Sequence, residues 1–158
     1  MIQRIQTLFL LAAAILSFII IINPVSEMRL IDKSQVKFTS FRIKSVNEPV
    51  KTYLYTYPIG VIAIVSTLFS LLAIFLFHKR IIQMRLCVYN ILINIALLLI
   101  MFFYYFKIRN DTFNQFSIVS HSFTYTVIFP IVIIILLFQA FRTIRRDELL
   151  IKSYNRLR

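Results

Sequence analysis

The sequence predicts an all-α membrane protein of one domain, residues 1–158, in which four transmembrane helices form a bundle. A small extracytoplasmic β-hairpin or three-stranded sheet is expected between the first and second helices. Three observations predict this fold class. Hydrophobic residues make up 59% of the chain, against about half in soluble domains. Several apolar runs are long enough to cross a bilayer, and a short basic connection, residues 78–85, separates two of them.

Four apolar runs define the predicted spans, at residues 5–22, 58–77, 86–106 and 121–141. Pro24 follows the first run, and proline cannot continue a helix. Pro58 opens the second run, where the missing N–H of proline costs little. Pro130 falls near the middle of the fourth run, which predicts a kink there.

Residues 24–57 form the predicted extracytoplasmic cap. Residues 36–44 and 51–57 alternate in polarity and are rich in β-branched and aromatic side chains. A turn signal at 46–49 lies between them, a pattern typical of a β-hairpin. Residues 28–31 are a candidate third strand. Because two strands alone are only marginally stable in water, we expect the sheet to lie on the helix ends.

The distribution of Lys and Arg predicts the orientation. The segments assigned to the cytoplasm (1–4, 78–85 and 142–158) hold 10 Lys and Arg in 29 residues, against 8 in 48 for the outer segments (24–57 and 107–120). Short loops rich in Lys and Arg stay in the cytoplasm. The sequence therefore predicts a bacterial inner-membrane protein with both termini in the cytoplasm. The net charge is +12, and the basic residues lie beside the apolar runs. An anionic lipid surface is therefore their expected partner, and we expect no nucleic-acid partner.

Residues that carry chemistry are scarce in the spans. All six acidic residues, and every Lys and Arg, lie outside them, whereas ion paths and proton relays need ionisable groups inside the membrane. The predicted topology places His78 and His121 on opposite sides of the bilayer, so they cannot share a metal. Cys87 lies a short way along the sequence from His78. Two interpretations of Cys87 are open: one half of a Cys–His dyad, or an inert small residue in a helix. We expect no enzyme activity, no catalytic residues, no cofactor and no metal.

Asn90 and Asn94 are the candidate polar contacts within the membrane. Their spacing of four residues places both on one side of the third helix. Buried amides in lipid need hydrogen-bond partners. They are interpreted as polar contacts between helices, with a ligand or partner contact as the alternative.

Small residues recur every three or four positions along the second span. Such a stripe lets helices approach closely, either within the bundle or at a homodimer seam. The candidate helix-packing seam comprises Gly60, Ala63, Thr67 and Ser70.

The tail, residues 142–158, combines an apolar stripe at helical spacing with basic residues. A basic amphipathic helix next to a membrane usually lies on the lipid surface, and the alternative is a helix that docks on a protein partner. The acidic Asp147 and Glu148 interrupt the basic residues. The candidate partner or lipid contacts are Arg142, Arg145, Arg146, Lys152, Arg156 and Arg158.

Three stretches carry a resemblance to a known family. They are the opening Met1–Thr7, the run Gln83–Cys87 followed by Asn90–Leu92, and the ending Arg145–Ser153 with Asn155–Arg158. The whole chain resembles small four-span inner-membrane proteins of Bacteroidota, classified as domain of unknown function 4293. The chain departs from the family pattern at Asn155, where Asp is usual. The resemblance implies the topology and the inner-membrane location, and it implies no activity, ligand or catalytic residue.

Two functions follow as hypotheses. The first is a non-enzymatic accessory subunit or scaffold of a membrane complex, with a membrane protein or a second copy as its partner. The alternative is a binder or carrier of a lipid or small apolar ligand within the helix bundle. A cavity lined by Asn90 and Asn94 would favour the binder, and a filled core would favour the scaffold.

Overall fold

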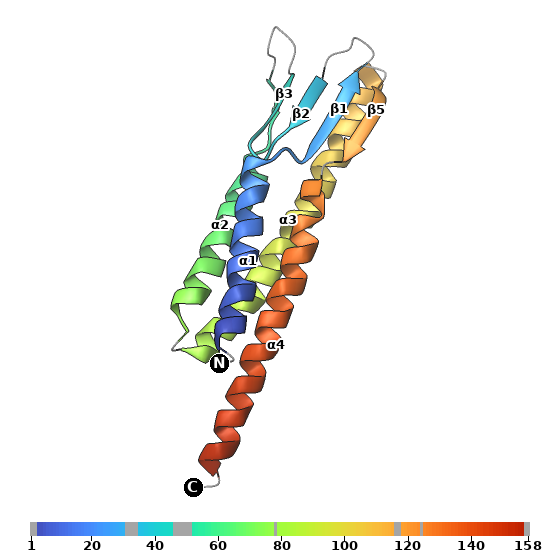
Figure 1. Cartoon of the computed structure of the whole chain (residues 1–158). Helices are drawn as coiled ribbons and strands as arrows, with labels where there is room; N and C mark the ends of the chain where they lie inside the picture. Colours follow the sequence, from blue (N-terminus) through green and yellow to red (C-terminus); the bar gives the residue numbers. More distant parts are fainter. Residues whose placement is uncertain are drawn as a thin grey trace.

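The computed structural model describes residues 3–30, 35–45, 52–77, 79–115, 118–123 and 125–156. Within these residues four α-helices lie side by side in a bundle (Figure 1). Each helix contacts two neighbours, in the ring α1–α2–α3–α4. The helices are α1 (Gln3–Ile22), α2 (Tyr57–Phe75), α3 (Arg80–Gln115) and α4 (Phe129–Arg156), the last preceded by the 3₁₀ turn η1 (Tyr125–Val127).

All four helices contain a segment long and apolar enough to cross a membrane. The side chains buried between them are small or aliphatic, whereas many large apolar side chains face outward: Leu8, Phe75, Leu99 and Phe103 are 65–75% exposed. An apolar exterior of this kind suits lipid and not water. The protein is therefore a multi-pass membrane protein. Side chains with no exposed surface include Leu10, Ala13, Ile20, Ile59, Ala63, Leu97, Ile133, Leu137, Ala140 and Ile144.

Two helix boundaries differ from the prediction. Helix α4 begins at Phe129, so Pro130 is its second residue, where a missing N–H leaves no gap in the helix. The predicted kink at Pro130 is wrong for that reason. Helix α3 begins at Arg80 and continues to Gln115, a length of about 54 Å. It takes in most of the predicted basic connection and part of the polar segment after the third span.

The fold-class prediction is wrong about the sheet. The described residues include a five-stranded antiparallel sheet, in the order β4–β3–β2–β1–β5, so the chain is not all-α and the cap is neither a hairpin nor three-stranded. The predicted strand at 36–44 is divided by a turn at 39–41, and the fifth strand comes from the far side of α3. The strands are β1 (Ser26–Leu30), β2 (Gln35–Phe38), β3 (Arg42–Ser45), β4 (Thr52–Tyr55) and β5 (Ile118–Phe123).

The fifth strand escaped prediction because its pairing is non-local. Met28 in β1 lies opposite His121 in β5, and the whole of α2 and α3 separates them in sequence. A hairpin leaves a local turn signal, whereas a pairing between distant segments leaves none. The predicted fourth span began at His121, so the sequence interpretation merged β5 and η1 with the helix that follows.

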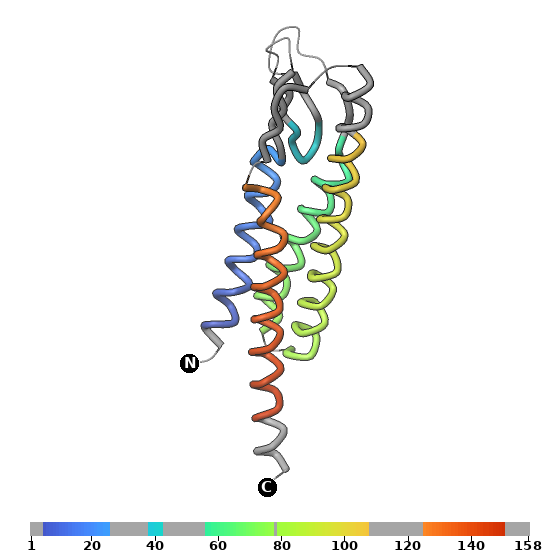
Figure 2. The backbone as a smooth tube through the Cα atoms, turned by 90° about the vertical axis from the view of Figure 1, so that its right-hand side faces the viewer, coloured from blue at the N-terminus to red at the C-terminus, as the bar shows by residue number. Residues whose placement is uncertain are grey.

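The turn between β2 and β3 rests on the ends of α1 and α2, coloured cyan in Figure 2. Ser40 Oγ donates to the carbonyl oxygen of Ile20 at 2.6 Å. The backbone N–H of Gly60 donates to the carbonyl oxygen of Ser40 at 3.0 Å. Thr56 Oγ1 donates to the carbonyl oxygen of Thr39 at 2.9 Å. The first two bonds satisfy backbone groups that helix termini otherwise leave unpaired, and all three fix the sheet on the bundle.

Candidate functional site

Five buried polar side chains from three helices meet inside the bundle. Their exposed fractions are at most 1%. We call them the Ser–Asn cluster: Ser17 from α1, Ser66 and Ser70 from α2, and Asn90 and Asn94 from α3.

Asn90 joins α3 to α2 through three hydrogen bonds. Ser66 Oγ donates to Asn90 Oδ1 at 2.8 Å. Asn90 Nδ2 donates to Ser70 Oγ at 2.7 Å and to the carbonyl oxygen of Ser66 at 3.2 Å. The amide of Asn90 therefore uses both its donor and its acceptor atoms on one neighbouring helix.

Asn94 and Ser17 extend the Ser–Asn cluster along and across the bundle. Asn94 Nδ2 lies 2.8 Å from Ser66 Oγ, 2.8 Å from the carbonyl oxygen of Asn90 and 3.1 Å from Asn90 Oδ1. Ser17 Oγ lies 3.2 Å from Ser66 Oγ and donates to the carbonyl oxygen of Ala13 at 2.9 Å. Asn94 Oδ1 is buried without a hydrogen-bond partner among the described residues. Neutral amides and hydroxyls carry no proton-transfer chemistry near neutral pH, so the cluster is equipped to hold helices together.

The small-residue stripe of α2 faces into the bundle. Three of the four residues of the candidate seam, Gly60, Ala63 and Ser70, are buried. Thr67 is only half-buried, and its hydroxyl donates to the carbonyl oxygen of Ala63 in its own helix. Ser66 takes its place in the buried stripe. Sequence spacing allowed either residue, since both lie three or four positions from Ala63 and Ser70.

A second set of buried polar groups lies at the end of the bundle where the N-terminus and the α2–α3 connection are found (Figure 1). The sequence interpretation missed these groups. Gln6 in α1 donates through Nε2 to Asp147 Oδ2 in α4. Gln83 in α3 donates through Nε2 to the carbonyl oxygen of Ala73 in α2 at 3.0 Å. The exposed fractions are 6% for Gln6, 9% for Asp147 and 3% for Gln83. Polar residues at a helix end look solvated in a sequence, and only the neighbouring helix reveals their burial.

The predicted tail is a direct continuation of α4, which extends beyond the other helices (Figures 1 and 2). Ile144 is buried, whereas Arg142, Arg145 and Arg146 are exposed. Lys152 and Arg156 belong to α4, but their side chains lie outside the described residues, as does Arg158.

The described side chains include few that could bind a metal ion or act as a nucleophile. They contain no group of three or more His, Cys, Asp or Glu residues that is arranged to hold a metal ion. Cys87 is buried in the interior of α3, which limits its access to any reactant. His78, the other half of the hypothetical Cys–His dyad, lies outside the described residues.

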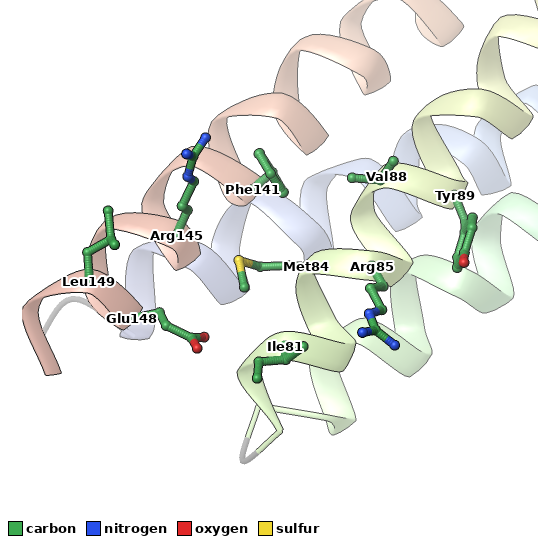
Figure 3. A pocket seen from close by; sticks show the side chains of 9 residues that line it. All are labelled: Ile81, Met84, Arg85, Val88, Tyr89, Phe141, Arg145, Glu148 and Leu149. Atoms are coloured by element: carbon green, nitrogen blue, oxygen red, sulfur yellow. The ribbon is translucent and has the colours of Figure 1, made fainter. Parts of the chain in front are cut away.

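A groove of about 510 Å³ lies between α3 and α4, near the end of the bundle where α3 begins (Figure 3). We call it the α3–α4 groove. Helix α3 lines it with Ile81, Met84, Arg85, Val88 and Tyr89. Helix α4 lines it with Phe141, Arg145, Glu148 and Leu149. Neither Asn90 nor Asn94 lines this groove, so the two polar features of the bundle are separate.

Comparison with known families adds one decisive finding. The model of the family described as Domain of unknown function (DUF4293) matches residues 2–157. The chain belongs to this family. No protein in the curated set matches the chain. In this DUF4293 protein, the family match thus covers the four helices, the sheet and the α4 extension together.

Proposed function

We propose that this DUF4293 protein is a non-enzymatic accessory subunit or scaffold of a membrane protein complex. The proposal includes location in the bacterial inner membrane with both termini in the cytoplasm, where the basic end of α4 meets an anionic leaflet. The partner is a second membrane protein. The observation that carries the proposal is an exposed face on the C-terminal part of α4, formed by Arg142, Arg146 and Leu150.

From residue 142 onward, the faces of α4 differ in their exposure. Ile144 and Asp147, three residues apart, are buried against the bundle. Arg142, Arg146 and Leu150, each four residues from the next, are exposed. Residues at this spacing share one side of a helix, and we call these three the outer face. An outer face with two guanidinium groups and a leucine that is 57% exposed is suited to a partner with acidic and apolar groups.

The interior supports a structural role for the bundle. Asn90 and Asn94, which would line a cavity in a ligand carrier, are at most 1% exposed and bond to their neighbours. A carrier of apolar ligands would need an opening at this level. The alternative function, ligand binding at Asn90 and Asn94 inside the bundle, therefore has no specific observation in its favour among the described residues.

Co-purification under mild detergent tests the proposal. The wild-type chain, tagged and extracted from its native membranes, is expected to retain a membrane protein in stoichiometric amount. The triple variant Arg142→Glu, Arg146→Glu, Leu150→Ser should lose this protein while its melting temperature stays close to that of the wild type, because all three side chains are exposed. A matched control, Ile135→Ser on the lipid-exposed surface of the same helix, should retain the partner. Absence of any stoichiometric partner from the wild-type extract, after cross-linking as well, would contradict the proposal.

A further inference from the structure

The α3–α4 groove spans the boundary between apolar and charged sequence. In α3, Arg85 is followed directly by a run without charged residues from 86 to 106. In α4, an uncharged run ends at Phe141 and is followed by Arg142. One end of the groove, at Val88 and Phe141, therefore lies at the level of the apolar spans. The other end, at Ile81 and Leu149, lies about 10–12 Å farther along the helix axes, at 1.5 Å per residue. The charged lining residues Arg85, Arg145 and Glu148 lie between the two ends.

Two basic residues flank the groove between its apolar ends. Met84, Val88 and Phe141 reach into the space between the two helices, and the guanidinium groups of Arg85 and Arg145 lie on either side of it (Figure 3). A volume of about 510 Å³ falls within the range of about 300–1,000 Å³ that is usual for ligand sites. An occupant that combines an apolar chain with an anionic group would complement this lining.

We propose that the α3–α4 groove binds an anionic phospholipid. The headgroup phosphate lies between Arg85 and Arg145, and one acyl chain runs along Met84, Val88 and Phe141. Guanidinium groups present several N–H donors in a fixed plane, which matches the oxygens of a phosphate. The acyl chain gains contact with a concave surface that a flat helix face cannot offer.

The charge of the groove favours a lipid with a single net negative charge. Two arginines and Glu148 give the lining a formal charge of +1. A phosphodiester headgroup such as phosphatidylglycerol carries one negative charge and complements this value. Glu148 repels a more highly charged anion such as inorganic phosphate, which also has no chain to place against the apolar end. Specificity of this kind combines an attractive and a repulsive element.

Lipid titration of the purified full-length protein tests the site. The chain is extracted in a neutral detergent, delipidated, and titrated with phosphatidylglycerol while bound lipids are counted by native mass spectrometry. The double variant Arg85→Gln, Arg145→Gln should bind phosphatidylglycerol about 25-fold more weakly, taking about fivefold for each guanidinium. Arg142→Gln with Arg146→Gln removes the same charge from the outer face, and this matched control should bind as the wild type does. Phosphatidylcholine should bind less tightly than phosphatidylglycerol, and inorganic phosphate should not compete.

A second variant tests the apolar end of the groove. Val88 is 40% exposed, so Val88→Trp should fill the groove without disturbing the core. It should abolish the tightly bound lipid while the melting temperature of the lipid-free protein stays unchanged. Equal weakening by the groove and outer-face variants would overturn the proposal in favour of non-specific surface charge. Unchanged lipid counts in Val88→Trp, together with loss of a co-purifying protein, would overturn it in favour of a protein in the groove.

Discussion

The ring of Phe41, in the turn between β2 and β3, occupies the space that a side chain at Gly60 would need. A Cβ atom at residue 60 would lie 2.7 Å from Cδ1 of Phe41 and 2.8 Å from Cζ. Gly60 is the only glycine in the chain, and its backbone N–H bonds to the carbonyl oxygen of the neighbouring Ser40. The sheet thus approaches the first turn of α2 at the one position that carries no side chain.

We expect Gly60→Ala to destabilise the junction between sheet and bundle. Hydrogen bonds hold the backbone of the turn in place, so the added methyl group must displace the Phe41 ring, at a cost of about 1–3 kcal/mol. Thermal unfolding in detergent measures the loss. The effect should largely vanish when Gly60→Ala is made in a Phe41→Ala background, because the clashing ring is then absent. Equal destabilisation in both backgrounds would contradict the contact as its cause.

The Ser–Asn cluster predicts a second stability effect. Replacing Asn90 and Asn94 by Leu removes their bonds to Ser66 and Ser70 and should lower the free energy of unfolding by about 1–3 kcal/mol, taking about 0.6–1.7 kcal/mol for the inter-helix contact of each asparagine. Leu has a higher intrinsic helix propensity than Asn. A fall in the free energy of unfolding therefore cannot be caused by helix propensity. Ala96→Leu, on the exposed side of the same helix, is the control and should be neutral. Unchanged stability of the double variant would show that the amides serve something other than helix contact.

Sequence alone located the membrane-spanning helices because a long apolar run is a strong local signal. It also placed Asn90 and Asn94 on one side of α3, since helical spacing is a local property. It could not identify their partner Ser66, because the choice between residues 66 and 67 depends on how α2 rotates against α3. Which neighbour a side chain meets is decided by packing between helices.

The errors have the same origin. Strand β5 pairs with β1, and the bond between Gln6 and Asp147 joins residues 141 positions apart. No local pattern records either relationship. The sequence interpretation puts Pro130 mid-helix because no charged residue or proline between Asp111 and Pro130 marks where the helix begins, and hydropathy does not distinguish a strand from a helix.

The buried bond between Gln6 and Asp147 should show the asymmetry that is typical of hydrogen bonds. Gln6→Leu leaves the Asp147 carboxylate without this donor and should cost about 1–3 kcal/mol, whereas Asp147→Asn keeps an acceptor oxygen and should cost less. The double variant Gln6→Leu, Asp147→Leu should recover much of the loss, because no buried polar group remains unpaired. Unfolding midpoints of the three variants decide the matter. If the double variant is less stable than Gln6→Leu, the cost does not come from an unpaired buried carboxylate, and this explanation is wrong.

Cysteine labelling tests the predicted orientation, and the structure selects the probes. Gln83 lies in the predicted basic connection but is only 3% exposed, so it would label poorly from either side. Lys79, between α2 and α3, and Arg42, at the start of β3, are exposed. Only α2 crosses the membrane between these two positions. In a Cys87→Ala background, an impermeant maleimide added to intact cells should label Arg42→Cys and spare Lys79→Cys.

The controls separate orientation from accessibility. Both cysteines should label once the cells are permeabilised, since both native side chains are exposed. Labelling of Lys79→Cys alone in intact cells would reverse the orientation and move the basic end of α4, with the α3–α4 groove, to the outer leaflet. The positive-inside rule predicts against that result, because it would place the denser Lys and Arg segments outside the cell. Labelling of both cysteines in intact cells would mean that α2 does not cross the membrane, in conflict with the apolar exterior of the bundle.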